Sequence, residues 1–143
     1  MRTLVLFVTL AFGAPFAQAQ HALDARALAA LLPATLVGFP HGDVSAHDGV
    51  VTTTYRASHG EVVLQLHVLH GAGASDYQHR MCPTLETVAE RPACISHRHG
   101  TEITWVLNDA LRVALAGAND ADVRHAAAVL DLAPLSRLAR SAH

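Results

Sequence analysis

The sequence of 143 residues contains no lysine, and its ten basic side chains, all arginine, face twelve Asp and Glu residues. Proteins that bind nucleic acid neutralise phosphates with clustered Arg and Lys, and no such cluster occurs here. This composition argues against a nucleic-acid partner. The glycine-rich stretch at residues 70–75 also lacks the lysine of a phosphate-binding loop, so we interpret it as a flexible loop.

Aromatic side chains are also scarce, at 5% of the chain. Outside the apolar N-terminal segment they number four, which are Phe39, Tyr55, Tyr77 and Trp105. A core must therefore be built mainly from Leu, Val, Ile and Ala. We expect Trp105 to be a buried packing anchor rather than part of a ligand platform.

The chain has only two cysteines, Cys82 and Cys94. In an oxidising compartment an even number of cysteines most simply forms disulfides, so we predict a Cys82–Cys94 bond. Metal ligation by thiolates and a redox-active pair are the alternatives. A redox pair usually has the spacing CxxC, which is absent here.

Residues 1–19 have the three parts of a cleavable signal peptide. Arg2 gives a positive start, residues 4–12 form a run that is apolar except for Thr9, and Ala17-Gln18-Ala19 forms a small-x-small cleavage site. The apolar run is well short of the ~20 residues that span a membrane. We therefore predict a mature domain of residues 20–143 that is periplasmic or secreted, with no stable membrane insertion after cleavage. Loss of Arg2 leaves nine basic and twelve acidic side chains, a net charge near −3.

The apolar pattern predicts helices at the two ends of the mature domain. In residues 21–36, Asp24 can cap a helix whose apolar face is Leu28, Leu31 and Leu32, and Pro33 ends it. Near the C-terminus, Asn119 or Asp120 begins a second helix with a buried stripe of Val123, Ala127 and Leu130. Pro134 starts a short final helix.

Alternating β-branched and apolar residues predict strands between these helices, at residues 50–57, 61–70, 94–99, 101–108 and 111–117. Residues 71–91 have no sustained period, and we interpret them as an irregular excursion held to the sheet by the disulfide, with a short helical turn at residues 84–89. The predicted fold is α+β, an antiparallel sheet of four to five strands flanked by an N-terminal and a C-terminal helix.

The stretch ALDARALAALLPATLVGFPHGDVSAHDG, at residues 22–49, resembles a pattern of uncharacterised exported proteins of Gram-negative bacteria. These proteins have an Ala/Leu helix, an LLPxxLxGF turn and then a sheet. The resemblance covers about 30 residues and implies an envelope location. It implies no activity, because the pattern carries no assigned active site.

Histidine is unusually abundant, with eleven residues in the chain. His97 and His99 would share one face of a strand, and His79 in the excursion could supply a third ligand, for zinc, copper or nickel. No segment has the spacing of a zinc finger or of HExxH. Scattered surface histidines are the simpler interpretation, and metal binding is the alternative.

No catalytic constellation is evident. The serines lack a nucleophile elbow, and the cysteines are expected to be bonded to each other. We therefore expect no enzyme and no cofactor. The favoured hypothesis is a non-enzymatic domain that binds an envelope or extracellular protein through the disulfide-stapled loop at residues 71–99, because loops on a rigid sheet often carry binding functions.

Overall fold

A computed structural model describes residues 23–142, and the predicted signal peptide lies outside these residues. Their elements follow the order α1 (Ala25–Ala29), β1 (Thr35–Leu36), β2 (Phe39–Pro40), β3 (Ser45–His47), β4 (Val50–Ala57), β5 (Gly60–Val68), α2 (Ala74–Met81), β6 (Thr84–Val88), β7 (Arg91–Ser96), β8 (Thr101–Leu107), β9 (Leu111–Gly117), α3 (Asp120–Val129) and α4 (Ala133–Ser141). None of these helices is long and apolar enough to cross a membrane.

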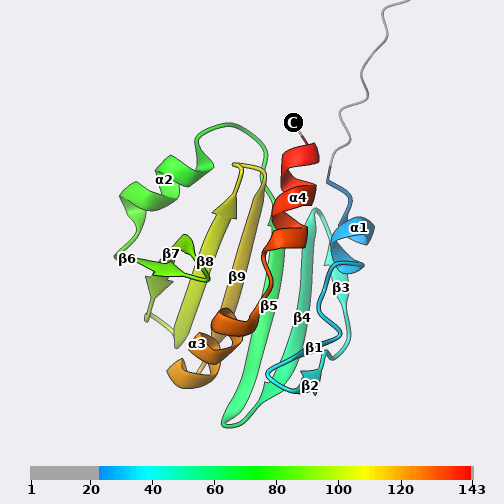
Figure 1. The fold of residues 1–143 in the computed structure, drawn as a ribbon, viewed down its shortest axis with the longest axis vertical. Coiled ribbons are helices and arrows are strands. Elements are labelled where there is room, and N and C mark those ends of the chain that lie inside the picture. Colours follow the sequence, from blue (N-terminus) through cyan, green and yellow to red (C-terminus); the bar gives the residue numbers. More distant parts are fainter. Residues whose placement is uncertain (1–22, 143) are drawn as a thin grey trace, which may run out of the picture.

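The central element is a seven-stranded sheet in the order β3-β4-β5-β9-β8-β7-β6, in which every neighbouring pair is antiparallel (Figure 1). Strands β1 and β2 form a separate two-stranded ribbon. The predicted α+β class and antiparallel pairing are confirmed, but the number of strands, four to five, is wrong. The prediction missed β3 and β6, which are edge strands with almost wholly exposed side chains and hence no apolar alternation.

Short turns join several of these strands. Asn108, Asp109 and Ala110 connect β8 to β9, and the first two have positive φ angles of 50° and 55°, in the left-handed region that tight hairpins use. Ala89 and Glu90 connect β6 to β7 in the same left-handed region, with φ of 51° and 61°. Alanine and glutamate are uncommon in such turns, so this hairpin has no recognisable turn signal in the sequence.

One face of the sheet carries the hydrophobic core. The alternation predicted for β5 is confirmed, because Val62, Leu64, Leu66 and Val68 are all buried. Trp105 of β8 is fully buried on this face, as expected, and its Nε1 donates a hydrogen bond to the carbonyl of Val88 at 3.1 Å.

The core face is covered by three helices. α1 contacts β3 and β4, α3 contacts β5, β8 and β9, and α4 contacts β8. Their buried side chains belong to the same core cluster as those of β5. α3 and α4 lie in front of the sheet in Figure 1.

The cap of α1 is confirmed, but its length is not. Asp24 accepts a hydrogen bond from the backbone N–H of Arg26, yet α1 ends at Ala29 rather than at Pro33. Leu31 and Leu32 still pack partly against the core, from the turn that follows. Burial of these leucines produced a helical spacing in the sequence without requiring a continuous helix.

Asn119 caps α3, and the predicted stripe of α3 is buried. Asp122 in the first turn accepts a hydrogen bond from the backbone N–H of His59 at 2.8 Å, which ties the β4–β5 turn to this helix. The predicted final helix is α4, in which Leu135 is buried and Leu138 is partly buried.

Candidate functional site

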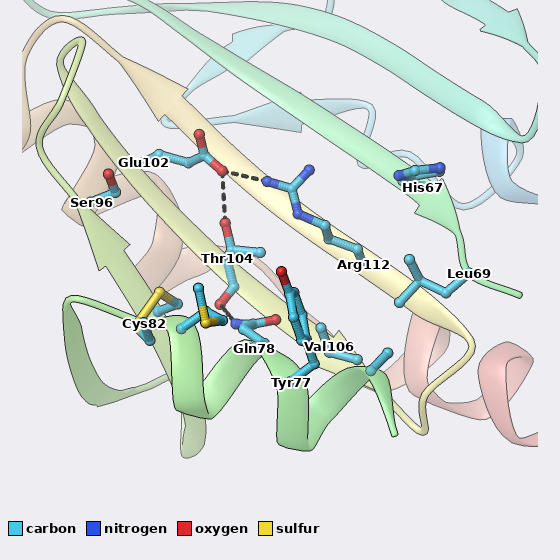
Figure 2. A pocket seen from close by; sticks show the side chains of 13 residues that line it. His67, Leu69, Tyr77, Gln78, Cys82, Ser96, Glu102, Thr104, Val106 and Arg112 are labelled. Atoms are coloured by element: carbon cyan, nitrogen blue, oxygen red, sulfur yellow. Dashed lines mark hydrogen bonds and ion pairs between the residues drawn. A yellow bond between two sulfur atoms is a disulfide. The ribbon is translucent and has the colours of Figure 1, made fainter. Parts of the chain in front are cut away.

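The second face of the sheet, which we call the open face, points away from the core. It is formed by the alternate residues of the strands, including Thr52, Val63, Gln65, Thr104, Val106, Arg112 and Ala114. Helix α2 crosses this face near β8. A cavity of about 430 Å³ lies between α2 and strands β8 and β9 (Figure 2).

The N-terminal end of α2 is held by the β8–β9 turn. Gly73 is the N-cap residue, with φ of 83°, and offers no side chain to cap the helix. Instead, the carboxylate of Asp109 accepts hydrogen bonds from the backbone N–H groups of Gly73 and Ser75, at 3.1 Å and 2.7 Å. A residue far along the chain therefore satisfies the free amides of this helix.

Two further contacts fix the rest of α2. Gln78 donates from Nε2 to the carbonyl of Thr104 at 2.9 Å. The predicted Cys82–Cys94 disulfide is confirmed, with Cα atoms 5.5 Å apart, and it joins the end of α2 to β7. The helix is thus attached at its start, middle and end, although it buries none of its own residues.

The prediction of an irregular excursion at residues 71–91 is therefore wrong in its local structure. The segment contains α2 and β6, and residues 84–89, where a helical turn was expected, lie in and just after β6. In α2 (ASDYQHRM), Ala74, Tyr77 and Met81 have the spacing of one helical face and line the cavity, but the helix is short and buries none of its residues in a packed core. Long-range hydrogen bonds and the disulfide hold it, and none of them leaves a local periodicity.

The walls of the cavity are largely apolar. Leu69, Val106, Tyr77 and Met81 line it, together with the disulfide. Figure 2 shows Tyr77 rising from α2 toward the strands that form the floor. Apolar walls with a few convergent polar groups are typical of ligand sites.

The floor of the cavity is polar. Arg112 of β9 forms an ion pair with Oε1 of Glu102 on β8, and the same oxygen accepts a hydrogen bond from the hydroxyl of Thr104 at 2.9 Å. His67 lies directly across from Arg112 on β5 and also lines the cavity. The sequence analysis did not single out Glu102 and Arg112. Their phase, opposite to the buried residues of the same strands, could have placed them together on the open face.

Large apolar side chains are exposed at the rim of this cavity. Tyr77 is 62% exposed, Met81 66% and Leu85 50%. Leu85 pairs with Cys94, which pairs with Thr104, so all three lie on the open face. We call Tyr77, Met81 and Leu85 the apolar rim.

The predicted metal ligands His97 and His99 do not lie on a strand, as they were expected to. His97 and His99 do not share the face of a strand, because β7 ends at Ser96 and both lie in the turn before β8. The chain turns at Gly100, which has φ of 101° and where a Cβ atom would lie 2.5 Å from the carbonyl oxygen of Gly117. Within residues 23–142 no group of three His, Cys, Asp or Glu residues could hold a metal ion, so binding of zinc, copper or nickel through His79, His97 and His99 stays a prediction.

A hydrogen-bonded chain begins at His97 instead. Its Nδ1 lies 3.2 Å from the hydroxyl oxygen of Thr101, and that hydroxyl donates to Asp120 at 2.9 Å. The hydroxyl of Thr101, followed by Arg124, lowers the pKa of Asp120 below its ordinary value. Arg124 in turn has a raised pKa, chiefly through its hydrogen bond with Glu86 of β6. This network joins the β6–β7 hairpin at the edge of the sheet to the start of α3, on the core side of the sheet.

Comparison with known proteins adds no assignment to these features. No protein-family model, no curated protein and no solved structure matches the chain. The function must therefore be argued from the arrangement of the residues themselves.

Proposed function

We propose that this is an exported, non-enzymatic domain that binds an envelope or extracellular protein through residues 71–99. The observation that carries this proposal is the combination of firm attachment and exposure in α2. Asp109, Gln78 and the disulfide fix the helix, while Tyr77 and Met81 remain more than half exposed. Exposed apolar side chains gathered in one place commonly mark a binding surface.

Rigidity favours binding because an already ordered surface loses less conformational entropy when it engages a partner. Tyrosine and methionine are also enriched in protein interfaces relative to the rest of the surface. Both properties support a protein partner at the apolar rim. The disulfide is compatible with an oxidising compartment, and export itself follows from the signal peptide predicted at residues 1–19.

A binding role is also favoured over catalysis by the state of the carboxylate in the cavity. Oε1 of Glu102 accepts hydrogen bonds from both Arg112 and Thr104, and these contacts orient the carboxylate as a structural group. A general base would instead need a reacting proton within reach and a pKa suited to its release. No hydrogen bond among the described residues links His67, the other candidate base of the cavity lining, to a nucleophile.

Site-specific photo-crosslinking in cells that produce the protein tests this proposal. A photoreactive amino acid at Tyr77 or Leu85 should give one discrete adduct, whose second component mass spectrometry identifies as an envelope or extracellular protein. Val129 on α3 is a matched control, because it is similarly exposed, at 53%, but lies on a helix that packs against the core face. Equal adducts at all three positions, or none at Tyr77 and Leu85, would contradict the proposal.

A further inference from the structure

The cavity beneath α2 has the size of a ligand site. Its volume of about 430 Å³ lies within the range of about 300–1,000 Å³ for ligand pockets. Tyr77 and Met81 of the apolar rim line it together with Val106 and Leu69. A partner that covers the rim would therefore leave an unfilled apolar space unless one of its own groups entered it.

The floor defines the chemistry of that group. Glu102 and Arg112 carry opposite charges, and their side chains are 41% and 33% exposed. Both of the hydrogen bonds that Glu102 accepts from described residues use Oε1, and Arg112 donates to it only from one terminal nitrogen. The floor thus offers a carboxylate oxygen and guanidinium N–H groups side by side, with no net charge.

A neutral group that both donates and accepts hydrogen bonds matches such a pair. An amide can donate its N–H to Glu102 and accept from Arg112 without separating the two. A carboxylate would be attracted by Arg112 but repelled by Glu102. An ammonium group would be attracted by Glu102 but repelled by Arg112. The apolar walls require that the amide be attached to a large apolar body.

We infer that the cavity accepts one large apolar side chain of the bound protein, whose neighbouring main-chain amide bonds to Glu102 and Arg112. This inference rests on the proposed function, since it specifies how the partner would be anchored. A buried apolar anchor in a pocket, surrounded by contacts that exclude water, is the usual source of binding energy in protein interfaces. The ligand class is therefore a peptide segment with an uncharged amide next to a Phe- or Leu-like side chain.

Three small probes with the same aromatic body test the charge preference. N-acetyl-phenylalanine amide is neutral, 3-phenylpropionate is an anion, and phenethylammonium is a cation. In an NMR titration of the oxidised protein, the neutral amide should bind about tenfold more tightly than either ion, a difference of about 1.4 kcal/mol. Its shifts should map to the Gln78 side-chain amide and to the backbone of Val106.

Variants of the floor should change this preference in opposite directions. Glu102→Gln leaves Arg112 without its anion, so the affinity for 3-phenylpropionate should rise until it is the tightest-binding probe. Arg112→Met leaves Glu102 without its cation, so the affinity for phenethylammonium should rise instead. A merely structural defect would weaken all three probes alike, which makes the reversal specific to the floor.

A filled cavity provides the steric control. Val106→Trp should abolish binding of the neutral probe by occupying the space under α2. Val63→Trp places the same side chain on the open face, on β5 outside the cavity lining, and should leave binding unchanged.

Two results would overturn the inference. Tighter binding of 3-phenylpropionate by the unmodified protein would indicate an anionic ligand such as a fatty acid. The absence of any binding up to the solubility limit of the neutral probe would show that the cavity is not an anchor site. Both results are independent of the crosslinks at Tyr77 and Leu85, so failure of the anchor and failure of the proposed function can be distinguished.

Discussion

The carboxylate of Asp109 accepts a hydrogen bond from the backbone N–H of Ser75 at 2.7 Å, across 34 positions of the sequence. A hairpin turn thereby supplies the cap that α2 cannot provide for itself, because its N-cap residue is a glycine. The N-terminal cap of α2 therefore depends on the turn between β8 and β9. This dependence couples the candidate binding helix to the sheet beneath it.

Replacement of Asp109 should loosen α2 selectively. Asp109→Asn tolerates the left-handed backbone of this turn but retains only one acceptor oxygen, so one of the two capping hydrogen bonds is lost. We expect a loss of about 1 kcal/mol and faster amide exchange in α2. Asp131→Asn is the control, since Asp131 accepts from the backbone N–H of Ala133 at the start of α4. It should leave exchange in α2 unchanged, and an equal effect of the two variants would argue against the cap.

Removal of the disulfide should lower the free energy of unfolding of the whole domain. The bond closes a loop with a sequence separation of 12, so the Cys82→Ala, Cys94→Ala double variant should lose roughly 3 kcal/mol in chemical denaturation, through greater freedom of the unfolded chain. Intact-mass analysis of unmodified protein after unfolding without reductant should detect no alkylated thiol. Two alkylated cysteines in that sample would show that the bond does not form in solution.

Burial of Trp105 can be separated from its hydrogen bond. Trp105→Ala should cost about 3–5 kcal/mol, because a fully buried ring is removed from the core. Trp105→Phe keeps most of the apolar contact but leaves the Val88 carbonyl without its donor, and it should cost about 1–3 kcal/mol. Denaturation curves of both variants measure these losses. A loss below about 1 kcal/mol for the alanine variant would be typical of a surface position.

The core face was predictable because burial there leaves a period in the sequence. Leu64 and Leu66 on β5, and Val123 on α3, lie where alternation and helical spacing place them. The open face leaves weaker marks, since Glu102 and Thr104 could equally be solvated surface residues. The alternation along the strands is enough to place these residues on the open face, but it does not predict the cavity above them.

The excursion was not predictable for a different reason. Its helix and its edge strand are determined by partners that are distant in the sequence, Asp109 for α2 and β7 for β6. Among the distant contacts of this segment, only the disulfide could be predicted from the sequence, because a cysteine pair can be inferred from composition and compartment. His97 and His99 lie outside β7 because the chain leaves the strand at Ser96 and turns at Gly100, where close approach to the Gly117 backbone leaves no room for a side chain, and no single-sequence pattern encodes this approach.

Acid should weaken the contact between Thr101 and Asp120. The lowered pKa of Asp120 means that its folded carboxyl binds protons less readily than the unfolded one, whose pKa is 3.8. Its contribution to stability is therefore present above that value and is lost as the pH falls through the lower, folded pKa. Thr101→Val removes the hydroxyl donor, so the difference in unfolding free energy from the unmodified protein should shrink below about pH 4.

Thr53→Val is the control for this pH dependence. Thr53 is equally buried, but its hydroxyl donates to the backbone carbonyls of Gly42 and Asp43, which do not titrate. Its stability loss should stay constant from neutral pH to about pH 3. A constant loss for Thr101→Val as well would show that Asp120 does not depend on that hydroxyl.

Divalent metal ions should leave the thermal midpoint where it is. The single hydroxyl proton of Thr101 is donated to Asp120, so Nδ1 of His97 must donate to the Thr101 oxygen and only Nε2 remains for a metal. One imidazole nitrogen of His97 with exposed His99 makes two ligands at most, too few for a closed zinc site. We therefore expect no change of midpoint with micromolar zinc, copper or nickel, measured by thermal unfolding. A real site would raise stability by RT ln(1 + [L]/Kd), and this gain would vanish in the His97→Ala, His99→Ala double variant but not in His47→Ala. That pattern would replace the view of these residues as surface histidines with the metal-binding alternative.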